Sequence, residues 1–166
     1  MPYGQNSVFV YFIKMKKKEK YEMMLPQLKA LTEGVNNNNT GALANAAALI
    51  HETMGFFWTG FYLVKDNVLH LGPFQGPVAC YTIPYGKGVC GAAWKESKTL
   101  VVKDVEEFPG HIACSSLSRS EIVVPIFKAD KIIGVLDIDS TETGTFDATD
   151  RDYLEKAMDI LSRNLV

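Results

Sequence analysis

Residues 121–139 read EIVVPIFKADKIIGVLDID and predict a β-hairpin, because β-branched residues dominate both halves. We expect its strands at Glu121–Phe127 and Lys131–Asp139. Since side chains alternate along a strand, the second strand presents two faces, with Ile132, Leu136 and Ile138 on one and Ile133, Val135, Asp137 and Asp139 on the other. Both faces are apolar except at the end of the strand. This hairpin is therefore expected inside a sheet that helices cover on both sides.

The elements outside the hairpin predict an α+β domain. Apolar residues at helical spacing, such as Tyr21, Leu25 and Leu28, indicate a helix near the start, and strand-like aromatic runs follow Gly55. The expected elements are, in order, helices 19–33 and 41–54, strands 56–64, 68–74 and 78–83, a helix 89–97, a short strand 99–102, the hairpin, and a helix 149–165. Thr40 is the predicted N-cap of the second helix. This order predicts a mainly antiparallel sheet of about six strands with helices packed on both sides.

Length and composition predict one globular domain. The chain has 166 residues, of which 47% are hydrophobic, enough for a single core. We expect residues 1–18 to be an N-terminal extension without fixed structure and residues 19–166 to form the domain. The net charge is −2 and the basic residues are scattered, so no nucleic-acid partner is expected. The apolar run at residues 8–13 is too short for a membrane span or a signal peptide, so no membrane partner is expected either.

Residues able to carry chemistry gather in one part of the chain. They are three cysteines followed by three acids, namely Cys80, Cys90, Cys114, Glu121, Asp137 and Asp139. Thiols can do redox chemistry and clustered carboxylates can hold a cation, so this set predicts an enzyme for a small zwitterion if the fold brings it together. An odd cysteine count without dense spacing also favours a reducing, cytoplasmic compartment.

The spacing of the acids indicates one converging cluster. Asp137 and Asp139 lie two apart on one strand face, so their side chains are expected roughly 7 Å apart. At an effective dielectric of about 20, two such charges repel by roughly 2 kcal/mol, which a bound cation would relieve. A three-residue loop at 128–130 puts Glu121 opposite Asp137 on the same face, whereas a two-residue loop turns it away. Three converging carboxylates suit an ammonium group or a divalent metal. The alternative is that these acids have no ligand and simply lie at the solvent-exposed end of a strand.

The cysteines differ in their predicted surroundings. Cys114 lies with His111 in an irregular segment, Lys103–Ser120, where exposure and a lowered pKa favour a reactive thiol. Cys90 lies in the first turn of the predicted helix 89–97, where the helix dipole favours the thiolate. A single cysteine is more often a small buried hydrophobe. A zinc site is not favoured, because the chain has no C-x-x-C pair, so no metal is expected.

Several stretches resemble one known family. They are FFWTGFYL, GPFQGPVAC, GKGVCG, HIACSSLSRSEIVVPI, IIGVLDIDS and FDATDRDYLE. Over about residues 41–165 the chain resembles the free methionine-(R)-sulfoxide reductases, which are stand-alone GAF-domain enzymes that act on the free amino acid. The resemblance implies a GAF-like fold and reduction of free L-methionine-(R)-sulfoxide to methionine. It is specific, because an ordinary GAF domain has no reason to carry both the cysteine triplet and the paired aspartates.

The resemblance also implies roles for the cysteines. The cysteine matching Cys114 is the nucleophile, which attacks the sulfoxide sulfur and becomes a sulfenic acid. Cys80 or Cys90 then condenses with that acid to give a disulfide, with Cys80 the preferred partner. An external thioredoxin or another dithiol resets the enzyme by thiol exchange. No bound cofactor is implied.

A substrate pocket follows from the same resemblance. The implied binding residues are Trp58, Tyr62, Ile112, Ala113, Glu121, Asp137 and Asp139. The two aromatics, four apart on one strand face, form an apolar wall for the S-methyl group. The three acids hold the α-ammonium, and one of them, not assigned further, protonates the sulfoxide oxygen. Backbone N–H groups of the two residues before Cys114 receive the α-carboxylate.

One alternative function is a non-catalytic GAF sensor of a small molecule, because a fold alone does not decide function. Against it, the chain carries no N-K-F-D-E-like signature of the cyclic-nucleotide binders. A homodimer formed through a sheet edge or the final helix is compatible with either function.

Overall fold

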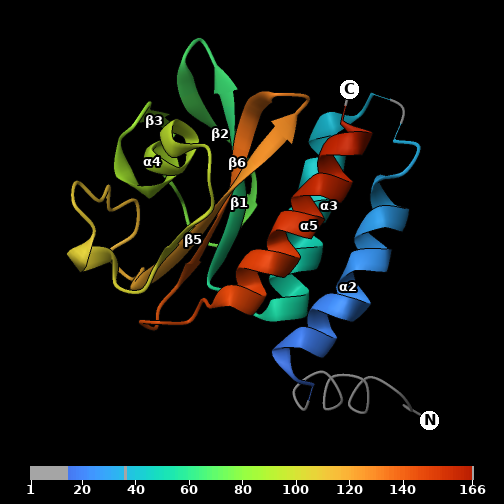
Figure 1. Cartoon of the computed structure of the whole chain (residues 1–166), viewed down its shortest axis with the longest axis horizontal. Coiled ribbons are helices and arrows are strands. Elements are labelled where there is room, and N and C mark those ends of the chain that lie inside the picture. Colours follow the sequence, from blue (N-terminus) through green and yellow to red (C-terminus); the bar gives the residue numbers. More distant parts are fainter. Residues whose placement is uncertain (1–14, 36, 166) are drawn as a thin grey trace.

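The chain folds around one sheet with helices on both faces (Figure 1). The structure, a computed structural model, describes residues 15–35 and 37–165. Within these residues the helices are α2 (Lys17–Thr32), α3 (Asn39–Met54), α4 (Gly88–Glu96) and α5 (Ala148–Asn164), with a short 3-10 turn, η1 (Val105–Glu107). The strands are β1 (Trp58–Lys65), β2 (Val68–Gln75), β3 (Thr82–Pro84), β4 (Leu100–Val102), β5 (Ser120–Lys128) and β6 (Lys131–Ser140).

The described strands form a single sheet in the order β3-β2-β1-β6-β5-β4, and every neighbouring pair is antiparallel. Helices α2, α3 and α5 cover one face, and α4 lies on the other (Figure 1). Phe61 and Leu136 belong to the hydrophobic cluster under the three helices, whereas Tyr62 and Val135 belong to the cluster under α4. Adjacent residues of a strand thus enter opposite cores, which confirms the predicted α+β sheet covered on both sides.

The β5–β6 hairpin has a different register from the one predicted. Its turn contains two residues, since Lys128 pairs with Lys131, yet Glu121 still shares a face with the aspartates. A β-bulge explains this, because Phe127 pairs with Ile132 and Ile126 with Gly134, leaving Ile133 as an extra residue. Glu121 consequently pairs with Asp139; it lies neither opposite Asp137, as a three-residue loop would have placed it, nor on the other face, as a two-residue loop without a bulge would have. The bulge also turns Ile133 toward the cluster under the three helices, opposite to the predicted face.

The first two helices begin at different residues from those expected. Helix α2 begins at Lys17, so residues 17 and 18 belong to the helix and not to the predicted extension; residues 1–14 lie outside the described residues. Helix α3 is capped by Asn38, not Thr40, because the Asn38 side chain accepts a hydrogen bond from the backbone N–H of Gly41 at 3.0 Å. Both Asn and Thr are good capping residues, so the sequence alone did not decide between them.

A buried ion pair joins the start of α2 to the start of α5. The Asp150 side chain is fully buried and lies 2.5 Å from Lys17 Nζ. It also accepts hydrogen bonds from the Tyr21 hydroxyl at 2.7 Å and from the backbone N–H of Asp147 at 2.8 Å. Asp147 and Asp150 form a reciprocal capping box at the start of α5. One carboxylate therefore fixes both the helix start and the position of α2.

We expect Asp150→Ala to lower the free energy of unfolding by about 3–5 kcal/mol, because it leaves a half-buried Lys17 without its main partner and removes the capping box. Chemical denaturation measures this loss. Asp152→Ala, an exposed site on the same helix, is the matched control and should change stability by less than about 0.5 kcal/mol. Equal effects of the two substitutions would contradict the structural role of Asp150.

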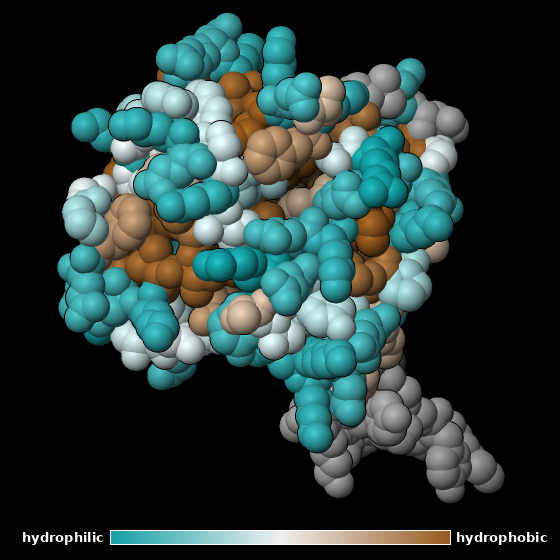
Figure 2. All heavy atoms as spheres, viewed as in Figure 1, coloured by the Kyte–Doolittle hydropathy of each residue, from teal (hydrophilic) through white to brown (hydrophobic). Residues whose placement is uncertain are grey.

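Hydrophilic side chains dominate the face seen in Figure 2, and hydrophobic side chains show as separate patches between them. Within the described part of the chain, no helix combines the length and apolar character needed to cross a membrane. The large hydrophobic side chains that remain exposed are Leu31, Val78, Tyr81, Tyr85, Leu117 and Phe127. Four of these six lie within five residues of Cys80 or Cys114 in the sequence.

Candidate active site

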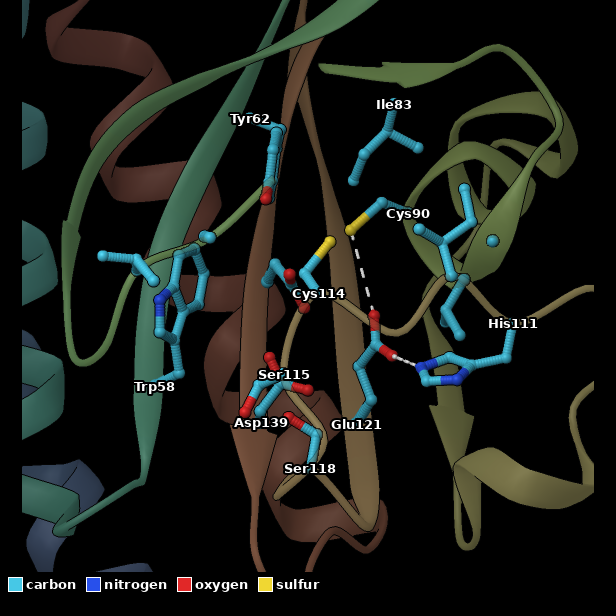
Figure 3. A pocket seen from close by; sticks show the side chains of 16 residues that line it. Trp58, Tyr62, Ile83, Cys90, His111, Cys114, Ser115, Ser118, Glu121 and Asp139 are labelled. Carbon is cyan, nitrogen blue, oxygen red and sulfur yellow. Dashed lines mark hydrogen bonds and ion pairs between the residues drawn. The ribbon is translucent and has the colours of Figure 1, made fainter. Parts of the chain in front are cut away.

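A pocket lies on the face of the sheet that carries α4 (Figure 3). Strands β1, β5 and β6, the start of α4 and the loops around residues 79 and 114 supply its walls around a cavity of about 40 Å³. It contains eight of the ten predicted site residues: Trp58, Tyr62, Cys90, Ile112, Cys114, Glu121, Asp137 and Asp139. The two that do not line it are Cys80, which is bonded to Cys114, and Ala113, whose side chain is exposed.

The aromatic wall of the pocket comes from β1. The rings of Trp58 and Tyr62 stack with their centroids 6.1 Å apart. Gly60 lies between them in the strand, and a Cβ there would come within 2.4 Å of Trp58 Cη2, so glycine is needed for the Trp58 ring to lie where it does. Trp58 Nε1 donates to the carbonyl of Pro77 at 2.9 Å, and the Tyr62 hydroxyl donates to the carbonyl of Cys80 at 3.0 Å.

These two hydrogen bonds correct the predicted third strand. The sequence predicted a strand at 78–83 that carries Cys80, whereas β3 begins only at Thr82. Pro77 has no backbone N–H to donate to a strand ladder, and the carbonyls of Pro77 and Cys80 bond to side chains of β1. Cys80 therefore lies in a loop that is tied to the aromatic wall.

Three acids form the polar side of the pocket. Glu121 and Asp137 are only 5% and 7% exposed. Burial, followed by the charges of Asp137 and Asp139, raises the pKa of Glu121 well above its usual value, and burial with the charge of Asp139 does the same for the pKa of Asp137. Burial raises the pKa of Asp139 to about 6, and a hydrogen bond with Ser118 opposes that rise. Near neutral pH, Asp139 is thus the most readily ionised of the three.

Cys90 lies in the first turn of α4, as predicted, but its thiolate is not favoured. The residue is 2% exposed, and its Sγ lies 3.9 Å from Glu121 Oε1. Burial, then the charges of Asp137 and Glu121, raises the pKa of the Cys90 thiol well above its usual value. Burial also lowers the pKa of His111, whose Nε2 lies 3.7 Å from Glu121 Oε2, so no positive charge compensates. Desolvation and nearby carboxylates therefore outweigh the partial positive charge of the helix start.

With the disulfide intact, Cys90 should react with iodoacetamide at pH 8 at least about 10²-fold more slowly than an unstructured cysteine, because the thiolate is the nucleophile and burial limits access. Mass spectrometry of the alkylated protein measures the rate. The same protein in guanidinium chloride should react quickly at this one thiol. Reaction of the folded protein at the unfolded rate would mean that Cys90 is accessible and ionised.

A disulfide joins Cys80 to Cys114, with their Cα atoms 5.3 Å apart. It links the loop before β3 to the irregular segment before β5. Cys90 is the free cysteine. Cys114 lines the pocket together with the three acids, so one sulfur of the disulfide and the three carboxyl groups occupy one place. This pairing agrees with the sequence-based preference for Cys80 as the disulfide partner of Cys114. The catalytic roles of the cysteines stay predictions.

Some lining residues were not predicted from the sequence. They are Val78, Ala79, Ile83, Gly88, Val89 and Ser118. Gly88 has a positive φ of 60°, and a Cβ there would lie 3.2 Å from Ile112 Cγ1, so this glycine lets the Cys114 segment approach α4. The G-K-G pattern before the helix was the available signal. Ser118 gave no signal, because it is one of several hydroxyls in an irregular segment.

Comparisons with known proteins agree with this geometry. A family model described as a GAF domain matches residues 40–166. The chain is 55% identical over 146 residues to GAF domain-containing protein A of Dictyostelium discoideum, covering 87% of this chain and 92% of that protein. It is 43% identical over 152 residues to the free methionine-R-sulfoxide reductase of Escherichia coli, covering 91% of this chain and 92% of that protein.

A solved structure is also similar over most of its length. It is the free methionine-R-sulfoxide reductase from Neisseria meningitidis in complex with its substrate, with a TM-score of 0.88, 49% identity and 90% of each chain covered. The six-stranded antiparallel sheet and the matched family model thus define a GAF domain. Given these identities over about nine tenths of its length, the chain belongs to the free methionine-R-sulfoxide reductase family of GAF-domain proteins. The resemblance noted from the sequence motifs is confirmed.

Proposed function

We propose that this chain is an oxidoreductase that reduces free L-methionine-(R)-sulfoxide to methionine by cysteine chemistry. The observation that carries the proposal is that Cys114, one end of the disulfide, lines the same pocket as Glu121, Asp137 and Asp139. Relatives named for this activity support it, among them the Neisseria protein solved with its substrate. A passive sensor has no need of a disulfide beside its ligand pocket.

The proposed chemistry transfers one oxygen atom and two electrons. The Cys114 thiolate attacks the sulfoxide sulfur and forms a transient S–S bond to it. The oxygen, with one proton, then passes to Cys114 as a sulfenic acid, while the S–S bond and the S–O bond to the methionine sulfur break. Methionine is the reduced product. The Cys80 thiol then attacks the Cys114 sulfur, so an S–S bond forms and the oxygen leaves as water. An external dithiol reduces this disulfide to two thiols and is itself oxidised.

The acids divide the binding and protonation work in this proposal. Asp139, whose pKa burial raises to about 6, is ionised at neutral pH and holds the α-ammonium. Glu121 and Asp137 keep a proton between them because burial raises the pKa of each, and either can pass it to the sulfoxide oxygen. Trp58 and Tyr62 contact the S-methyl group from the opposite wall.

Selectivity for the free amino acid follows from the same charges. The residues that line the pocket include no lysine or arginine, so we propose the backbone N–H groups of Ile112 and Ala113 for the α-carboxylate. A methionine sulfoxide within a peptide has neither free terminus, and it would leave Asp139 buried without a cationic partner. Rejection of peptide substrates should therefore be strong.

The proposed reductant is a protein dithiol of the thioredoxin class. Val78 and Tyr81, which flank Cys80, are 86% and 83% exposed and leave an apolar surface beside the disulfide that a protein reductant can contact. A cytoplasmic location fits this proposal, because the cycle needs a reducing environment. We propose no bound cofactor. Whether two copies associate stays a prediction that size-exclusion chromatography tests.

An assay of methionine release tests the function directly. The full chain with dithiothreitol is given each diastereomer of free methionine sulfoxide, and then N-acetylmethionine sulfoxide. Turnover of the free R form alone is expected. Equal turnover of the N-acetylated compound would contradict the role given to the acids, and no turnover of any sulfoxide would favour the sensor.

A further inference from the structure

One thiol and two carboxylates form a compact cluster at the base of the pocket. One ligand atom from each of Cys90, Glu121 and Asp137 lies within 4.8 Å of the other two. All three side chains are buried, with 2%, 5% and 7% exposure respectively. Figure 3 shows the Cys90 sulfur directed at the Glu121 carboxylate. These three groups come from α4, β5 and β6, so three separate elements fix the cluster.

A second observation indicates that the cluster lacks a ligand. The Asp137 side chain shares hydrogen bonds with Glu121 and Cys90, but its buried Oδ1 has no hydrogen-bond partner among the described residues. A buried carboxylate oxygen without a partner is costly, and such atoms mark places where a water, an ion or a substrate belongs. The residues lining the pocket offer no lysine or arginine to neutralise it. A cation that displaces the Cys90 thiol proton and the proton held by Glu121 and Asp137 is a ligand that fits these donor atoms.

We propose that Cys90, Glu121 and Asp137 bind a thiophilic divalent cation such as Zn²⁺, which competes with the substrate and thereby inhibits the enzyme reversibly. The inhibition rests on the proposed function, whereas the binding does not. The cation is a regulatory ligand, not a resident cofactor.

The geometry suits zinc with little movement. Zn–S bonds of about 2.3 Å and Zn–O bonds of about 2.0–2.2 Å put tetrahedral sulfur and oxygen ligands about 3.5 Å apart. Cys90 Sγ and Glu121 Oε1 are already 3.9 Å apart. The adjoining cavity of about 40 Å³ has room for a water as the fourth ligand. The thiolate selects against Mg²⁺ and Ca²⁺, which prefer ligand sets made only of oxygen.

Cobalt titration of the oxidised full-length protein tests the site. The disulfide leaves Cys90 as the free thiol, so a near-ultraviolet thiolate-to-Co²⁺ charge-transfer band would report this residue alone. We expect one Co²⁺ per chain, the band, and its displacement by Zn²⁺. Cys90→Ser should abolish the band, and Asp137→Asn should weaken binding at least about tenfold. Absence of the band in the wild-type protein would overturn the proposal, as would equal binding by Cys90→Ser.

Asp139→Asn is the matched control for charge. It removes the same negative charge from the pocket, but its carboxylate is not part of the cluster, so the charge-transfer band should persist. Loss of the band in this variant would mean that the ligand set is wrong.

A single-turnover assay separates binding from inhibition. Reduced, desalted protein is mixed with substrate and one equivalent of Zn²⁺, which should slow methionine formation at least about tenfold, and EDTA should restore it. A protein that binds Co²⁺ but reduces no sulfoxide would refute the proposed function and keep the metal site. A protein that reduces the sulfoxide but binds no metal would refute the metal site and keep the proposed function.

Discussion

Replacing Cys114 with serine is expected to lower kcat/KM for free methionine-(R)-sulfoxide by at least about 10³-fold, because a hydroxyl is a far weaker nucleophile than a thiolate. The other cysteines are poor substitutes. Burial and nearby carboxylates raise the pKa of Cys90, and Cys80 does not line the pocket. Chromatography of released methionine measures the rate, and a thermal unfolding curve verifies that the variant is folded.

Cys80→Ser is the matched variant for the second step. It keeps the proposed nucleophile, so with thioredoxin in place of dithiothreitol, which can reduce a sulfenic acid directly, it should release one methionine per chain in a burst and then stop, because the sulfenic acid on Cys114 has lost its partner. Continued turnover at the wild-type rate would mean that Cys90 resolves the intermediate, contrary to the preferred order. A burst from Cys114→Ser would exclude that residue as the nucleophile.

Replacing Asp137 with asparagine is expected to lower kcat/KM about 10²-fold, since it removes one of the buried acids that face the substrate. The loss should fall on kcat, because in the proposed function Glu121 and Asp137 hold the proton that passes to the sulfoxide oxygen. The preference for free methionine sulfoxide over its N-acetyl derivative should persist in this variant and should shrink in Asp139→Asn, which removes the proposed ammonium partner. Asp152→Asn, an exposed site on α5, controls for the loss of a negative charge elsewhere. An unchanged kcat in Asp137→Asn would contradict the role of Asp137 in protonation.

The same substitution should make the protein more stable at alkaline pH. Burial and the charge of Asp139 raise the pKa of Asp137 in the folded chain. The folded chain therefore holds a proton that the unfolded chain releases near pH 4, and the stability linked to that proton is lost as the pH rises through the raised pKa. Asparagine cannot ionise, so the denaturation midpoint of the variant should exceed that of wild type at pH 8, with a smaller difference at pH 5. A lower midpoint at both pH values would contradict this.

The sequence was most informative where a pattern repeats along one element. The apolar runs around Val124 and Leu136 predicted the central hairpin, and the alternation of side chains predicted two cores. The position of the bulge was not predictable, because Ile133 is an apolar, β-branched residue like its neighbour Ile132. Its unpaired place depends on how the hairpin packs against helices distant in sequence. With the two-residue turn, this one extra residue changed the partner of Glu121 from Ile138 to Asp139 and so returned Glu121 to the face that carries the aspartates.

The surroundings of each side chain were the least predictable property of the site. Local reasoning assigned Cys90 a stabilised thiolate from its place at a helix start. Burial reverses this assignment, helped by two acids that lie 31 and 47 residues further along the chain, at Glu121 and Asp137. Likewise, the run 78–83 has strand-like composition, but hydrogen bonds from Trp58 and Tyr62 hold Pro77 and Cys80 in a loop. Contacts between distant segments decide such cases, and a single sequence does not reveal them.

The aromatic wall has a consequence for altering substrate range. Trp58 and Tyr62 line the pocket, where we propose that they shape the space for the S-methyl group, and they also anchor the loop that carries Cys80. Shortening either side chain to admit bulkier sulfoxides would release an anchor of the sulfur proposed to resolve the sulfenic acid. An engineered variant could then accept the new compound and still recycle slowly. If the proposed roles hold, evolution of this pocket toward other sulfoxides is constrained in the same way, because the same two side chains then serve both substrate choice and regeneration.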